Sequence, residues 1–200
     1  MVPPGPSRGG KAQAWVPRFA AARRPEDDRR LGCDAVIELD AIDRRLLALL
    51  QENGRTPYAE LARAVGLAVS SVNERVRKLY ERGTISGVHA MVEPAAVRLE
   101  LLAFVFVSWN EPAVEPLFLA RIAGENVVQE AHHVTGPWNY LMKVRVTTTQ
   151  MLEAFLARVV KTVPGVQRTE TLIALSTFKE TAALPLEPPA WFVPKDVLRG

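Results

Sequence analysis

The chain has 200 residues, of which 48% are hydrophobic and 24% are charged, as in an ordinary globular protein of one large or two small domains. The longest apolar run, residues 101–107, is too short to cross a bilayer, and no secretory signal follows Met1. The single cysteine, Cys33, excludes an intramolecular disulfide. We therefore expect a cytoplasmic protein that neither spans nor contacts a membrane.

The net charge of +3 arises entirely in residues 1–35, where seven basic side chains outnumber four acidic ones. Bulk charge therefore says little about nucleic acid, and any DNA-binding surface must be inferred from where the charges lie. Residues 1–36 are rich in Pro, Gly and Arg and are expected to form a disordered basic tail. Two alternatives are a basic arm that adds nonspecific DNA affinity and a true start downstream of Met1.

Three short helices are predicted within residues 37–86. The first is capped by Asp40 and ends at Gly54, and the second opens with Thr56 as N-cap and Pro57 in its first turn. A glycine turn then leads to a third helix that begins near Ser70 or Ser71. Two short helices joined by a glycine turn are the helix-turn-helix arrangement.

Beyond this segment the pattern changes to alternating short strands and helices. Residues 84–92 are β-prone, and residues 87–100 form a linker to a second domain, residues 101–184. That domain has the order βαββαβ of a ferredoxin-like unit, with strands at 101–109, 127–134, 140–146 and 166–178 and helices at 114–122 and 151–160. Residues 185–200 contain four prolines and are expected to be a tail, although Trp191, Phe192 and Val193 suit docking on a neighbour.

The third helix carries a polar outer face. With Val72, Val76 and Leu79 directed inward, the 100° step of a helix turns the intervening polar residues outward. Such side chains donate to phosphates and base edges, although a solvated face of an ordinary three-helix bundle is the structural alternative. The candidate DNA-binding residues are Ser70, Ser71, Asn73, Glu74, Arg75, Arg77 and Lys78.

Residues 39–87, LDAIDRRLLALLQENGRTPYAELARAVGLAVSSVNERVRKLYERGTISG, closely resemble the N-terminal domain of the Lrp/AsnC regulators, or feast/famine regulatory proteins. The opening L-D-x-x-D matches Leu39, Asp40 and Asp43, and the ending G-x-I-x-G matches Gly83, Ile85 and Gly87. In the second domain, V-x-G-x-x-(D/N)-Y matches Val134, Gly136, Asn139 and Tyr140, and the L-P-G-V motif matches residues 163–166.

The resemblance implies an α+β fold: an N-terminal winged-type helix-turn-helix domain of three helices, then a ferredoxin-like domain for effector binding and oligomerisation. It implies a sequence-specific DNA-binding transcription regulator whose partners are double-stranded DNA, further copies of itself and an amino-acid or other small-molecule effector. Family members form dimers that often assemble further, for instance into octamers.

The chain departs from the family before the third helix. The family often has Ser-Pro where this chain has Ala68 and Val69, so the usual N-cap is missing. Ser71 with Glu74 is one replacement, as a capping box. The family often has Arg at the position of Glu74. If Glu74 instead faces DNA, it accepts a hydrogen bond from a cytosine amino group.

The second domain is expected to dimerise and to sense a ligand. Residues 101–109 are apolar on both alternating faces, whereas helices cover only one face of such a sheet, so the bare face implies a partner sheet. In relatives, the loop after the second strand helps to bind the effector; here its candidate residues are Gly136, Pro137, Trp138, Asn139 and Tyr140. Acidic residues common at positions 137 and 139 are absent, so we expect a weak response to zwitterionic amino acids.

Two other classes of function find less support. His132 and His133 are adjacent on a strand and point to opposite faces, so no metal site is expected, and no cofactor either. No nucleophile elbow, P-loop or dinucleotide fingerprint is present, so we do not expect an enzyme. A ferredoxin-like enzyme that binds a small molecule, or an assembly protein with degenerate DNA binding, remains the alternative.

Overall fold

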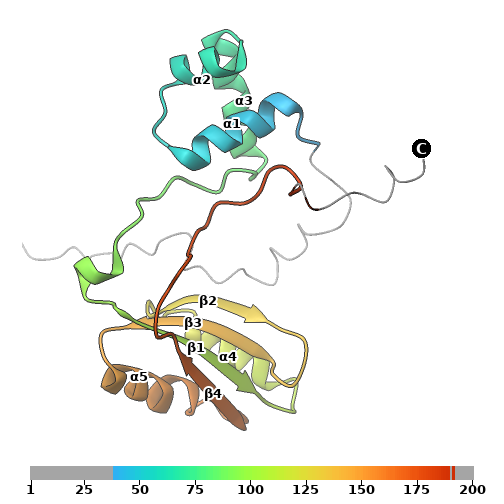
Figure 1. The fold of residues 1–200 in the computed structure, drawn as a ribbon. Helices are drawn as coiled ribbons and strands as arrows, with labels where there is room; N and C mark the ends of the chain where they lie inside the picture. The colour runs from blue at the N-terminus through green and yellow to red at the C-terminus, as the bar shows by residue number, and fades with distance from the viewer. Residues whose placement is uncertain (1–37, 190, 192–200) are drawn as a thin grey trace, which may run out of the picture. The chain divides into compact units, whose positions relative to one another are not determined.

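The computed structural model describes residues 38–189 and Trp191. The described chain divides into two compact units, a helical one (residues 38–92 with 177–189) and a sheet unit (residues 93–176), each considered by itself (Figure 1). The tail predicted for residues 1–36 lies outside the described residues, as do Phe192 and Val193.

The helical unit contains α1 (Ala41–Glu52), α2 (Tyr58–Val65) and α3 (Val69–Glu81). Their apolar stripes meet in a small core whose fully or almost fully buried members are Leu46, Leu61, Ala62, Val72 and Val76. The predicted cap of α1 is present, because the Asp43 N–H donates to Asp40 Oδ1 over 2.7 Å. Gly66 has the positive φ of +70° that the turn between α2 and α3 requires.

Two helix starts differ from the sequence prediction. The N-cap of α2 is Pro57 rather than Thr56, whose hydroxyl instead donates to the Asn53 carbonyl over 2.7 Å. The N-cap of α3 is Ala68, without a side-chain cap. Because the Ala68 carbonyl accepts from the Val72 N–H, α3 begins before Ser71, and the proposed Ser71–Glu74 capping box is wrong.

No strand follows α3 within the described residues 82–92. The strand expected from the β-prone segment 84–92 is therefore wrong, since β-branched residues make a strand only where a second strand supplies hydrogen bonds. The three helices of the expected helix-turn-helix are present, and the wing does not appear among these residues.

The sheet unit opens with the short 3-10 helix η2 (Pro94–Val97) and then follows the predicted βαββαβ order. Its elements are β1 (Leu101–Ser108), α4 (Val114–Ile122), β2 (Val128–His133), β3 (Tyr140–Val146), α5 (Thr149–Phe155), the π-helical turn η3 (Leu156–Val160) and β4 (Arg168–Ile173). The strands lie in the order β2-β3-β1-β4, and every neighbouring pair is antiparallel. The ferredoxin-like fold is confirmed.

The last strand is shorter than the predicted 166–178. The Ala174 N–H still donates to the Leu102 carbonyl, but β1 starts at Leu101, so residues 175–178 have no strand opposite them. Phe178 is fully exposed as a result.

The helices α4 and α5 lie against the same face of the sheet (Figure 1). On that face Ala103, Val105 and Val107 of β1 are completely buried. The other face, which we call the open face, carries Phe104 and Phe106, both half-buried, and Leu172, which is 51% exposed. The unit therefore has one covered apolar face and one that no helix covers.

Candidate nucleic-acid interface

The buried and exposed residues of α3 alternate as the helical period predicts. Val72, Val76 and Leu79 are at most 2% exposed and fasten α3 to the core. Five of the predicted DNA-binding residues are exposed, namely Ser70, Ser71, Asn73, Arg77 and Lys78. Glu74 is partly exposed. The structure thus gives α3 one apolar and one polar face, with the hydroxyl and amide groups nearer its N-terminus and the cations nearer its C-terminus.

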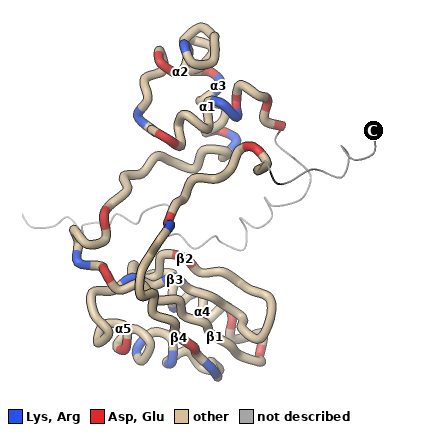
Figure 2. The backbone as a smooth tube through the Cα atoms, in the orientation of Figure 1, with Lys and Arg blue, Asp and Glu red and all other residues tan. Residues whose placement is uncertain are grey.

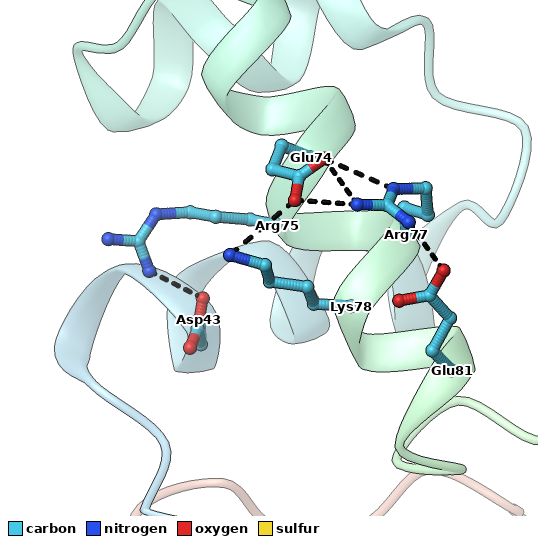
Figure 3. A network of polar contacts seen from close by, with 6 residues as sticks. All are labelled: Asp43, Glu74, Arg75, Arg77, Lys78 and Glu81. Carbon is cyan, nitrogen blue, oxygen red and sulfur yellow. Dashed lines mark hydrogen bonds and ion pairs between the residues drawn. The ribbon is translucent and has the colours of Figure 1, made fainter.

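Glu74 lies at the centre of a chain of ion pairs on this polar face (Figure 3). The Arg77 guanidinium donates to Glu74 over 2.6 Å and to Glu81 over 2.6 Å, and Lys78 Nζ lies 3.5 Å from Glu74. The hydrogen bond from Arg77 is the main reason that the pKa of the Glu74 carboxyl lies below its ordinary value. Two carboxylates therefore hold the cations that sequence analysis assigned to DNA.

Arg75 does not join this chain of ion pairs. Its guanidinium donates to Asp40 over 2.7 Å and to Asp43 over 2.8 Å, so it connects α3 to the start of α1. Figure 3 shows the contact with Asp43. The side chain of Asp43 is only 13% exposed. The hydrogen bonds that Arg75 donates to Asp40 and Asp43 raise the pKa of its guanidinium, and its charge is already compensated within the unit. The position of Arg75 thus argues against the predicted contact with DNA.

Both α1 and α3 carry acidic as well as basic residues (Figure 2). An open hollow between the two helices is lined by charged groups of both signs, among them Asp40, Asp43, Glu74, Arg75 and Lys78. Asp43 was missed as a partner of Arg75. The one signal in the sequence was the spacing of three residues between Asp40 and Asp43, which places both carboxylates on one side of the first turn of α1.

The predicted effector loop divides between the two faces of the sheet. Trp138 lies on the open face, with its ring 5.7 Å from Phe106 and the Arg168 guanidinium 4.6 Å from its centre. Tyr140 lies on the covered face, where its ring stacks on Trp109 at 5.7 Å and its hydroxyl donates to Glu115 over 2.7 Å. Gly136 and Pro137 are exposed, so the five predicted residues do not converge on one pocket within the unit.

Asn139 fastens this loop to the sheet. Its Oδ1 accepts from the Trp109 N–H over 2.8 Å, and its own N–H donates to the Val107 carbonyl over 3.0 Å. The side-chain oxygen of Asn139, one of the predicted effector-binding residues, therefore already accepts a hydrogen bond from the protein itself.

A charged group on the open face went unassigned in the sequence. Lys143 Nζ donates to Glu130 over 2.9 Å, and His132 lies 3.3 Å from the same carboxylate. The hydrogen bond from Lys143 is the first cause of the lowered pKa of Glu130. Both residues occupy one face because Glu130 is paired with Lys143 in the register of β2 and β3. The sequence gave no register of β2 and β3 and therefore no sign of this pair.

Comparison with known proteins agrees with this geometry. Residues 39–80 match the AsnC-type helix-turn-helix domain, and residues 102–184 match the Lrp/AsnC ligand binding domain. The HTH-type transcriptional regulator FL11 of Pyrococcus abyssi is 36% identical over 151 residues, which are 76% of this chain and 99% of that protein. The chain belongs to the Lrp/AsnC family of transcription regulators.

Other relatives of this Lrp/AsnC regulator include the leucine-responsive regulatory protein of Escherichia coli K12, 34% identical over 74% of this chain and 91% of that one. Among solved structures, a transcriptional regulator from Neisseria meningitidis in complex with L-Met is 30% identical, with a TM-score of 0.71 over 74% of this chain and 97% of that chain. The feast or famine regulatory protein of M. tuberculosis complexed with L-methionine is 37% identical, with a TM-score of 0.68 over 74% and 99%.

The family assignment makes the protein a DNA-binding transcription regulator with a helix-turn-helix and a C-terminal ligand-binding domain. No helix in the described part of the chain is long and apolar enough to span a membrane. Within residues 38–189 and Trp191, no three His, Cys, Asp or Glu side chains gather as a metal site requires.

Proposed function

We propose that this Lrp/AsnC regulator reads double-stranded DNA by placing the polar face of α3 in the major groove. Residues 37–86 are the DNA-binding domain of this proposal, and residues 101–184 are its effector-binding and dimerisation domain. The observation that carries it is the division of α3 into a buried stripe and an exposed face of Ser, Asn, Arg and Lys side chains. A recognition helix needs this division, because it must pack on its own domain and present donors to the groove.

On this proposal Ser70, Ser71 and Asn73 approach base edges, while Arg77 and Lys78 contact phosphates or guanine. Glu74 holds both cations in the absence of DNA, and a phosphate must compete with it for them. Exposed ion pairs of this kind contribute little to stability, so the exchange of carboxylate for phosphate is inexpensive. Arg75 is left out of the proposed interface because Asp40 and Asp43 hold it.

The test is a selection of bound duplexes from a random pool, followed by titrations of the selected duplex at several salt concentrations. Replacing Arg77 and Lys78 with alanine should weaken binding and reduce the salt slope by about 0.9 for each phosphate that is no longer neutralised. The matched control replaces Arg158 and Lys161 of the sheet unit with alanine, which removes the same charge. Equal effects of the two double variants would contradict the assignment to α3.

We also propose that a second copy of the chain covers the open face, and that such dimers assemble further, for instance into octamers. Support comes from the half-buried Phe104 and Phe106 and from Leu172, an exposed leucine on a sheet face without helices. Leu172→Arg should dissociate the dimer in light scattering at micromolar concentration. Leu117→Arg is the matched control, because Leu117 is 52% exposed on α4. A dimer that survives Leu172→Arg unchanged would contradict the proposal.

We infer that the sheet unit acts by binding a ligand rather than by catalysis, and that the ligand is not an ordinary zwitterionic amino acid. In the predicted effector loop, Trp138 packs on Phe106, and the Asn139 side-chain oxygen accepts a hydrogen bond from the Trp109 backbone N–H. Neither residue therefore offers an anion to an ammonium group. Calorimetry with each of the twenty amino acids tests this inference. Micromolar binding of any of them would contradict it. Pro137→Asp combined with Asn139→Asp should create such binding.

A further inference from the structure

A side chain of α1 is paired with the backbone of a segment that follows the sheet unit. The Leu184 N–H donates to Gln51 Oε1 over 2.7 Å, and Gln51 Nε2 donates back to the Leu184 carbonyl over 3.1 Å. The carboxamide thus satisfies both backbone groups of one residue, as a neighbouring strand does. Leu184 is 133 residues away from Gln51 in the chain.

A third hydrogen bond binds the same segment about two turns earlier on α1. Arg44 Nη1 donates to the Leu186 carbonyl over 2.7 Å in a partly buried position. Arg44 and Gln51 are seven residues apart and therefore share one face of the helix. Leu47 lies between them on this face; it is only 7% exposed, yet it is outside the core cluster of the three helices. Leu186 is the one partly buried residue among 181–189.

We propose that the face of α1 formed by Arg44, Leu47 and Gln51 is a binding site for the chain's own C-terminal segment, residues 184–186. This segment, here called the strap, gives the DNA-binding unit a second attachment to the ligand-binding domain. The first attachment is the chain between α3 and β1, and the second is the ten residues from the end of β4 to Leu184.

The composition of the strap suits this role. Pro185 lies between the two anchored carbonyls, and Pro188 and Pro189 follow, so the free segment has few conformations to lose when it docks. Recognition through backbone groups is strong enough for a tethered segment, because the ten-residue connection keeps its local concentration high. The docked strap thus connects α1 to the end of β4, in addition to the connection that the chain before β1 provides.

The first test is hydrogen exchange of the full-length protein at the Leu184 amide. Gln51→Ala removes both hydrogen bonds to Leu184, and exchange at this amide should become about tenfold faster. Glu52→Ala, the next residue of α1 and exposed, is the matched control and should leave the rate unchanged. Gln51→Glu keeps an acceptor for the Leu184 N–H and should give an intermediate rate. A Leu184 amide that exchanges equally fast in the wild type and in Gln51→Ala would overturn the strap.

The second test asks which chain supplies the strap. A Cys33→Ser background carries Ala48→Cys with Leu184→Cys, since Ala48 shares the helix face of Arg44 and Gln51 and its replacement leaves both anchors in place. The control pair is Ala48→Cys with Phe178→Cys, since Phe178 is fully exposed. Mild oxidation should close a disulfide within one chain faster for the first pair than for the control. Covalent dimers on a non-reducing gel would overturn the assignment to the same chain, and a first pair no faster than the control would overturn the docking itself. Neither result depends on DNA binding by α3.

Discussion

Glu74 is the acidic residue whose replacement should change DNA binding most. In the structure it accepts from Arg77 and lies within ion-pair distance of Lys78, and its pKa is below the ordinary value, so it stays ionised at neutral pH. Glu74→Gln removes this negative charge while it preserves the shape and an acceptor oxygen. Both cations of the polar face are then released toward phosphate, and Arg77 retains only Glu81.

The expected size follows from counterion release. If Glu74→Gln allows one more cation of each protomer to contact a phosphate, the slope of log affinity against log salt becomes steeper by about 0.9 per protomer. Between about 50 and about 200 mM salt, the affinity then falls by a further factor of about 3.5 per protomer. At low salt the variant should bind random duplex more tightly than the wild type does.

Fluorescence anisotropy on the selected duplex and on a random duplex, at several salt concentrations, measures both effects. Glu52→Gln is the matched control, since it makes the same charge change on an exposed residue of α1. Two results would refute the reasoning. An equal steepening in the control would make bulk charge the cause, and a loss of affinity only for the selected duplex would show that Glu74 itself reads a base.

Three further changes test the fold around the two sites by urea unfolding. Asn139→Ala deprives the buried Trp109 N–H of its acceptor and should cost about 1–3 kcal/mol, whereas Asn139→Asp, which keeps one, should cost less; equal losses would contradict this role. Phe118→Ala, at a fully buried ring beside Trp109 and Tyr140, should cost about 3–5 kcal/mol, and a loss below about 1 kcal/mol would contradict it. The hydrogen bond from the Asp43 N–H, and then that from Arg75, lower the pKa of Asp40, so the ionised carboxylate stabilises the fold above its unfolded pKa and this contribution is lost below about pH 4. Asp40→Asn should make the free energy of unfolding depend less on pH in this range. Identical pH profiles of the wild type and the variant would count against this role.

The sequence predicted the elements with strong periodicity and the residues that depend on it. Val72, Val76 and Leu79 recur at helical spacing, and their burial turns Arg77 and Lys78 outward without further information. The bounds predicted for β3 and α4 agree with the structure because turn residues flank both elements. Helix starts were less predictable. Thr56 and Ser71 each have a hydroxyl that suits an N-cap, but α2 and α3 begin after Pro57 and Ala68 instead.

The contacts that sequence could not supply are those between distant segments. Helical spacing places Arg75 beside the polar face of α3 and says nothing more about its partners. Only the position of α1 in the folded unit brings Asp40 and Asp43 to its guanidinium. Gln51 is an uncharged polar residue on an exposed helix surface and gives no periodic signal. Its partner lies in a proline-rich segment that composition describes as a tail, so the strap is visible only once the chain is folded.

The loop of residues 135–140 contacts both faces of the sheet, which suits the effector-binding role that we propose for this domain. Trp138 rests on Phe106 at the open face, where a ligand or a second copy would touch it, while Tyr140 is packed with Phe118 of α4 in the core. Asn139 lies between them and binds the backbone of β1 and Trp109, so the loop has little freedom to yield locally. A displacement of the loop backbone at Asn139 therefore acts on the end of β1. Because Val107 is paired with Thr169 and Ser108 with Arg168, a displacement at this end of β1 also reaches the start of β4, the strand whose other end leads to the strap.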